Sequence, residues 1–112
     1  MGIANEQVAS HLFLEAMYDD SYFPTRLVDK GKAILLRLCE AIEADKPTDL
    51  DALYALTHAA TEEFNELQEE FDDSGSEIET AARECIAGDF AFIANAYGFD
   101  ADIEELIAPR EW

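Results

Sequence analysis

The chain has 112 residues, of which 49% are hydrophobic, so it is long enough to bury a core and too apolar to be disordered. Its 26 acidic and 7 basic residues give a formal net charge of −19, which disfavours nucleic acid and anionic membrane surfaces as partners. Acidic helix faces that keep the protein soluble explain this charge most simply. A cationic protein partner, or mimicry of nucleic acid, is the functional alternative.

No targeting signal is expected. The N-terminal residues lack both the basic region and the long apolar run of a signal peptide, and Glu6 stands where N-myristoylation requires Ser or Thr. No segment is apolar enough to span a bilayer. Cys39 and Cys85 both lie on apolar helix faces, which predicts buried free thiols and a cytoplasmic location.

The first predicted helix covers residues 5–18. One apolar stripe recurs at helical spacing, and a weaker stripe that includes His11 lies beside it. The main stripe consists of Val8, Ala9, Leu12, Phe13, Ala16 and Met17. We expect His11 at the surface or at the boundary of the core, and not as a ligand.

The turn at residues 18–24 combines aromatic and acidic residues and has two interpretations. The aromatic side chains pin the turn to the core, or the segment forms the edge of a small acidic pocket. The ligand-binding candidates in this segment are Tyr18, Asp19, Asp20 and Tyr22. Either Ser21 or Thr25 is expected to cap the helix that follows, because Pro24 is tolerated in a first helical turn.

The second predicted helix covers residues 26–44. Gly31 lies inside its apolar stripe, where a larger side chain would keep two helices apart. We therefore expect Gly31 to permit a close helix approach, despite a propensity cost near ~1 kcal/mol. Leu36 points away from the stripe, so it is either exposed or in contact with a neighbouring element.

The third predicted helix covers residues 50–71, with Thr48 or Asp49 as its cap. Its polar side is strongly acidic, and residues 62–84 hold ten acidic residues and one basic residue, Arg83. We expect this side to be solvated and to be the docking surface for any cationic partner. The docking candidates are Glu62, Glu66 and Glu69.

The fourth predicted helix, residues 78–97, is apolar around most of its circumference and is therefore expected at the centre of the fold. Ser76 and Glu79 have the spacing of a capping box before it, and Gly98 stops it. Asp100 is expected to cap a short helix that follows. Trp112 is expected to fold back on the bundle.

Asp89 is the one carboxylate in the apolar arc of this fourth helix. A buried carboxylate needs a partner or a shifted pKa. A structural role would pair it with a cation or a tyrosine hydroxyl, and a functional role would place it in a ligand-binding or catalytic site. The candidate partners are Arg26, Lys30, Arg37, Arg83, Tyr18, Tyr22 and Tyr54.

The motifs of the common metal and catalytic sites are absent. No Glu-x-x-His, His-Glu-x-x-His or Cys-x-x-Cys pattern occurs, and there is no nucleophile elbow or phosphate-binding glycine loop. His58 and Glu62 share a helix face, which is typical of a surface pair, although His58 is also a candidate for a ligand pocket near Asp89. We therefore predict no catalytic residues, no metal and no cofactor.

The predicted fold is all-α and forms a single domain over residues 1–112. Four main helices with short connections and a short C-terminal helix favour a compact bundle or an orthogonal array. No repeat, linker or strand pattern interrupts this organisation.

Three stretches carry a resemblance to a known family. They are MYDDSYFPTRLVDKGKAILLRLCE, THAATEEFNELQEEF and DFAFIANAYGFDADIEELIAPREW. They are similar to a family of short bacterial helical proteins whose function is uncharacterised. The resemblance implies a bacterial, cytoplasmic protein, and it implies no catalytic residue, substrate or cofactor.

Three functional hypotheses follow. The first is a small acidic interaction or regulatory module that binds another protein through a helix face. The second is a small-molecule-binding or enzymatic helical domain whose site lies near Asp89 and the turn at residues 18–23. The third is a homodimeric structural protein that associates through Leu36 and neighbouring apolar positions.

Overall fold

A computed structural model describes residues 3–112 of the chain. These residues contain helices and no β-strand, which confirms the all-α prediction. The helices are α1 (Glu6–Ala9), α2 (Glu15–Tyr18), α3 (Thr25–Asp45), α4 (Leu50–Asp73), α5 (Thr80–Ala96) and α6 (Ile103–Leu106).

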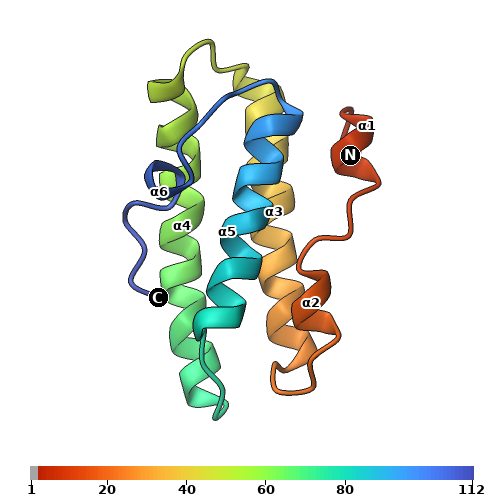
Figure 1. Cartoon of the computed structure of the whole chain (residues 1–112), viewed down its shortest axis with the longest axis vertical. Helices are drawn as coiled ribbons and strands as arrows, with labels where there is room; N and C mark the ends of the chain where they lie inside the picture. The colour runs from red at the N-terminus through yellow and green to blue at the C-terminus, as the bar shows by residue number, and fades with distance from the viewer. Residues whose placement is uncertain (1–2) are drawn as a thin grey trace.

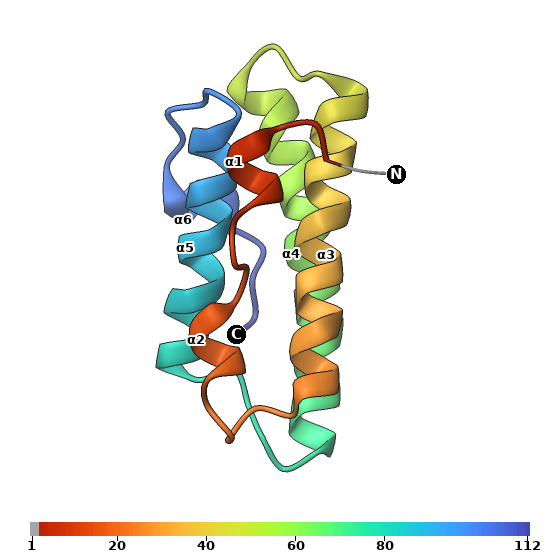
Figure 2. The ribbon, with the colours of Figure 1, turned by 90° about the vertical axis from the view of Figure 1, so that its right-hand side faces the viewer.

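The three long helices form an antiparallel bundle in which α3, α4 and α5 alternate in direction (Figure 1). Figure 2 shows the N-terminal segment running lengthwise along the bundle, where α1 contacts α5 and α2 contacts both α5 and α3. The segment with α6 lies against α4 and α5 on another side of the bundle. Helix α5 contacts α1, α2, α3 and α6, so its predicted central place is confirmed.

The prediction of one continuous helix over residues 5–18 is wrong. Two single-turn helices, α1 and α2, flank an irregular stretch that includes His11 and Leu14. Leu14 adopts a left-handed backbone conformation with a φ of 57°, which a helix does not accommodate. As a result Leu12, expected on the apolar stripe, is 66% exposed.

Helix α3 has nearly the predicted bounds and packs along α4. Neither Ser21 nor Thr25 caps it, because Pro24 occupies the N-cap position and no side chain bonds to the first turn. The predicted role of Gly31 is confirmed. A Cβ atom at this position would lie 2.9 Å from Cδ1 of Leu14 and 3.2 Å from Cε1 of Phe64.

Helix α4 begins as predicted, with the Asp49 carboxylate accepting the amide hydrogen of Ala52 at 2.8 Å. The start of α5 differs from the prediction. Glu79, and not Ser76, is the N-cap, and its carboxylate accepts the amide hydrogen of Ala82. The Ser76 hydroxyl is buried without a hydrogen-bond partner among the described residues.

The C-terminal part also differs in its cap. Gly98 ends the α5 segment with a φ of 86°, as expected for a helix stop. The short helix α6 is capped by Asp102 and not by Asp100, because the Asp102 carboxylate accepts the amide hydrogen of Glu104 at 3.0 Å. Trp112 folds back as predicted, and its ring lies edge-on to Phe64 with 6.1 Å between the centroids.

The apolar core fills the space between the long helices and extends under the N-terminal segment. Cys39 is fully buried in it, whereas Cys85, also expected to be buried, is only partly covered. Leu36 is half-buried and packs against the core, so the second of its two expected environments is the observed one.

Candidate functional site

Asp89 lies on the buried face of α5 and is 9% exposed, which confirms its predicted helical phase. Its Oδ2 atom accepts the amide hydrogen of Leu14 at 2.7 Å. Its Oδ1 atom lies 2.9 Å from Nε2 of His11. Because a carboxylate only accepts, Nε2 of His11 carries the hydrogen of this contact. The prediction that an arginine, lysine or tyrosine side chain pairs with Asp89 is therefore wrong.

The imidazole of His11 is held between aromatic rings. It stacks on Phe92 with 3.9 Å between the centroids and meets Phe13 edge-on at 4.6 Å. These contacts and the bond to Asp89 require the chain to leave the helical path after α1. A buried carboxylate on α5 therefore explains why the N-terminal segment is irregular where the sequence is amphipathic.

The pair of Asp89 and His11 resembles the carboxylate–imidazole part of a general-base site. The nearest thiol is a poor nucleophile for it. Burial, and next the charge of Asp89, raise the pKa of Cys85, so this thiol stays protonated at neutral pH. Both oxygens of Asp89 are already bonded within the chain, which makes the pair a structural anchor for the N-terminal segment.

The candidates in the turn do not converge on Asp89. The Tyr18 hydroxyl donates to Asp29 at 2.6 Å, and burial together with this bond raises the pKa of Tyr18 to about 12. The Asp20 carboxylate accepts the amide hydrogen of Tyr22 at 2.9 Å, which closes the turn locally. Asp19, Asp20 and Tyr22 are all exposed.

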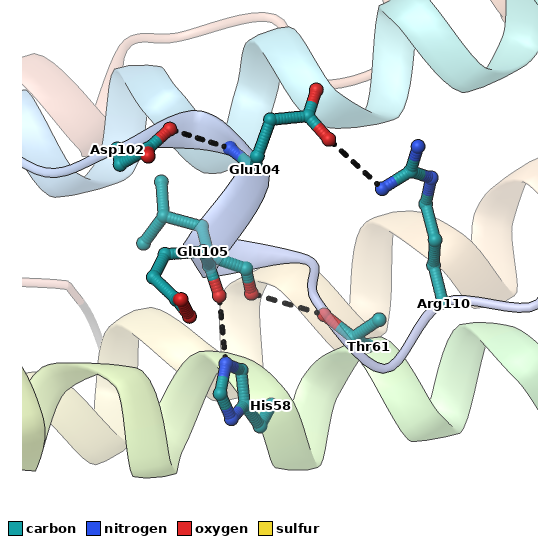
Figure 3. A network of polar contacts seen from close by, with 7 residues as sticks. His58, Thr61, Asp102, Glu104, Glu105 and Arg110 are labelled. Atoms are coloured by element: carbon teal, nitrogen blue, oxygen red, sulfur yellow. Dashed lines mark hydrogen bonds and ion pairs between the residues drawn. The ribbon is translucent and has the colours of Figure 1, made fainter.

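His58 lies on α4, far along the chain from these groups, and attaches the α6 segment to the bundle. Its Nε2–H donates to the Glu105 carbonyl at 2.7 Å, while the Thr61 hydroxyl lies 3.3 Å from the Leu106 carbonyl (Figure 3). The ring stacks on Tyr54 with an interplanar angle of 10°. This geometry assigns His58 to packing of α6, and it does not bring His58 into a pocket with Asp89.

The three docking candidates, Glu62, Glu66 and Glu69, are exposed along one side of α4 as predicted. They line a groove of about 460 Å³ between α4 and the C-terminal segment. The other lining residues are Asn65, Pro109 and Glu111. We name this site the acidic groove.

Asn65 fixes the shape of the acidic groove. Its Nδ2 atom donates to the Pro109 carbonyl at 3.1 Å, and its Oδ1 atom accepts the amide hydrogen of Glu111 at 2.8 Å. The sequence did not reveal Glu111 as a fourth carboxylate of this site, because it follows α6 in the chain and reaches α4 only through the Asn65 contacts. The buried ring of Trp112 holds the same segment in place.

A second polar cluster joins the start of the chain to the ends of α3 and α5. The Glu43 carboxylate accepts the amide hydrogens of Ala4 at 2.9 Å and Asn5 at 3.0 Å, and the Tyr97 hydroxyl at 2.6 Å. The bond from Tyr97 is the main cause that lowers the pKa of Glu43. Burial, followed by the bond to Glu43, raises the pKa of Tyr97. Sequence reasoning missed this cluster, since its members are dozens of residues apart.

The stability of the fold is expected to fall as the pH rises from 9.0 to about 12, because the Cys39 thiol ionises in the unfolded chain throughout this range. Burial, and next the charges of Glu43 and Glu40, raise the pKa of Cys39 from 9.0 to about 12. The folded state therefore keeps a proton that the unfolded state loses, and the linkage slope is negative in this window. Urea midpoints at several pH values test this, and Cys39→Ala should flatten the slope. A midpoint that does not fall in the wild type contradicts the prediction.

Residues 7–112 match a family described as a family of unknown function, DUF5713. The chain belongs to DUF5713. The resemblance to an uncharacterised family that the sequence indicated is thus confirmed. No curated protein and no solved structure matches this DUF5713 chain.

Within residues 3–112, no three histidine, cysteine or acidic side chains are close enough to hold a metal ion. Among the same residues, every helix is too short or too polar to cross a bilayer.

Proposed function

We propose that the chain is a protein-interaction module that binds a cationic segment of a partner in the acidic groove. The observation that supports this function is a groove lined by four carboxylates, those of Glu62, Glu66, Glu69 and Glu111. None of the four forms an ion pair within residues 3–112. The carboxylates therefore stay available to an external cation.

Basic residues near the groove are paired with other carboxylates. Arg110, between Pro109 and Glu111 of the groove in sequence, pairs with Glu104 at 3.4 Å, and two more basic residues lie in the neighbouring hollow that shares Glu66 with the groove. Arg37 pairs with Glu63 at 2.6 Å and Lys30 with Glu70 at 2.5 Å, both on the α3 side of α4. The groove also needs little ordering on binding, because Asn65 already holds its second wall. A preformed site loses less conformational entropy when it is occupied.

The other two functions considered from the sequence have less support. Asp89 is 9% exposed and its two oxygens face Leu14 and His11, so burial leaves little room for a ligand or a reaction at that place. Leu36 is half-buried against the core, which leaves less of it for an interface between two copies.

The setting that we infer is a bacterial cytoplasm. Two free thiols, Cys39 and Cys85, suit a reducing compartment, and the resemblance to short bacterial helical proteins points the same way. The net charge of −19 disfavours nucleic acid as the partner.

A fluorescent oligolysine peptide tests the proposal. We expect fluorescence anisotropy to show saturable binding at about 0.15 M salt and much weaker binding at about 0.5 M, where charges are strongly screened. The triple variant Glu62→Gln, Glu66→Gln, Glu69→Gln should lose most of the affinity. Exposed ion pairs typically contribute about 0.2–1 kcal/mol each, so the loss of all three carboxylates is needed for a clear effect.

A matched control separates the groove from the overall charge. The triple variant Glu15→Gln, Glu40→Gln, Asp45→Asn removes the same number of exposed charges elsewhere. It should bind the peptide nearly as well as the wild type. If both triple variants lose affinity equally, binding follows net charge, and the groove is not the docking site.

A further inference from the structure

An open groove of about 580 Å³ lies where the start of the chain meets the ends of α3 and α5. It shares no lining residue with the acidic groove. Its lining is Ala4, Asn5, Ile42, Glu43, Lys46, Pro47, Tyr97 and Phe99. A mostly apolar lining with a few polar groups, at this volume, is typical of small-molecule sites.

Glu43 is the polar group that is fixed in advance in this groove. Three donors hold its carboxylate, namely the amides of Ala4 and Asn5 and the hydroxyl of Tyr97. These bonds lower the pKa of Glu43, so the group is charged at neutral pH. A carboxylate has about four acceptor positions, and three are used, which leaves one for a further donor.

The surroundings of Glu43 favour a cation with an apolar body. The rings of Tyr97 and Phe99 line the groove, and aromatic faces attract ammonium groups. Ile42 and Pro47 provide apolar contact surface. The net charge of −19 raises the local concentration of cations around the whole protein.

We propose that this groove binds a small primary amine, with its ammonium group on the Glu43 carboxylate and its apolar body against Ile42, Pro47 and Phe99. The volume of about 580 Å³ lies within the range of small-molecule sites, so we infer a free small molecule as the occupant. Lys46 is the basic side chain among residues 3–112 that lines the same groove, and it can compete with a bound ammonium group for Glu43.

Octylamine is a suitable probe, with octanol as its neutral analogue and octanoate as its anionic analogue. In ¹H–¹⁵N correlation spectra of the full chain at neutral pH, octylamine should saturate with a dissociation constant of about 1 mM or below. The amides of Glu43, Lys46 and Phe99 should shift. Octanol should bind about tenfold more weakly, and octanoate should not bind, because both lack the ammonium donor.

Variants of α3 test the role of Glu43. Glu43→Gln should weaken octylamine binding by about tenfold, because the amide retains an acceptor and loses the charge. Glu40→Gln, one turn earlier and exposed, removes the same charge and should leave binding unchanged. Lys46→Gln should strengthen binding by about twofold, since it removes the competing cation without touching the N-terminal contacts of Glu43.

Three results would each overturn the proposal. The first is an octylamine titration in which the shift changes do not saturate, or in which only amides outside the groove shift. The second is octanol that binds as tightly as octylamine. The third is a loss of affinity in Glu40→Gln as large as that in Glu43→Gln. Since the acidic groove lies elsewhere, the oligolysine experiment can fail while this one succeeds, and the reverse.

Discussion

Asp89→Ala is expected to lower the free energy of unfolding by about 3 kcal/mol, the largest effect of any single substitution considered for this protein. The change leaves the amide of Leu14, which is buried, without an acceptor, and it removes the partner of His11. An unpaired buried donor costs about 1–3 kcal/mol, and loss of a bond to a charged group costs a similar amount. The N-terminal segment loses its anchor on α5.

Urea unfolding followed by circular dichroism measures this effect. Asp89→Asn should recover part of the loss, because the amide retains the size and one acceptor. Asp100→Ala is the matched control, since Asp100 is exposed and makes no side-chain bond within residues 3–112. If Asp89→Ala or Asp89→Leu is as stable as the wild type, the carboxylate is not a structural anchor, and a functional role for Asp89 becomes the better interpretation.

Gly31→Ala is expected to lower the free energy of unfolding by about 2 kcal/mol, although alanine is the better helix former. The added Cβ would lie 2.9 Å from Cδ1 of Leu14, closer than such atoms approach in proteins. The Leu14 side chain cannot easily move away, because it is 1% exposed and packed in the core, and its backbone is held by the bond to Asp89. The ring of Phe64, at 3.2 Å, is also buried and packs against Phe90.

Gly88→Ala, on the long helix α5, is expected to change the free energy of unfolding in the opposite direction. Gly88 is exposed on α5, and a Cβ there would meet no atom within 4 Å. Its substitution should therefore raise the free energy of unfolding by about 0.5–1 kcal/mol through helix propensity and a less flexible unfolded chain. Thermal or urea unfolding of both variants decides the matter. Equal signs for the two substitutions would refute the close approach at Gly31.

The long helices α3, α4 and α5 could be predicted to within a few residues, because each has an apolar stripe that continues for at least four turns. Gly31 and Asp89 were also recognised, since each departs from the residue type that its position in a stripe favours. Such departures are visible in a sequence. The residues that contact them in the folded structure are not visible in a sequence, and the predicted partners of Asp89 were therefore wrong.

The prediction of one continuous helix for the N-terminal segment was wrong for the same physical reason. The apolar spacing of this segment fits a continuous helix. Local helix propensity does not include the effect of Asp89, whose carboxylate lies 75 residues after Leu14 in the chain. The bonds from Leu14 and His11 to Asp89 compensate for the lost helical turns. The cap of α5 shows a smaller competition of this kind, in which Glu79 replaces Ser76 at the helix start.

The candidate sites also differ in how much of them the sequence reveals. Glu62, Glu66 and Glu69 could be assigned to one exposed face from helical spacing alone. Glu111 and the Glu43 cluster could not, because their positions depend on Asn65 and Tyr97, which reach them across the bundle. Sequence periodicity describes one helix at a time, whereas both grooves are formed between elements.

The anchoring of Leu14 also has a consequence for slow motions of the protein. Helices as short as α1 and α2 do not persist alone in water, so residues 3–18 are ordered only while they remain docked. Opening of this segment would expose the Leu14 amide to solvent while the long helices stay folded. Hydrogen exchange at that single amide therefore measures a local opening equilibrium, separate from the global one that protects the amides of α3 and α4.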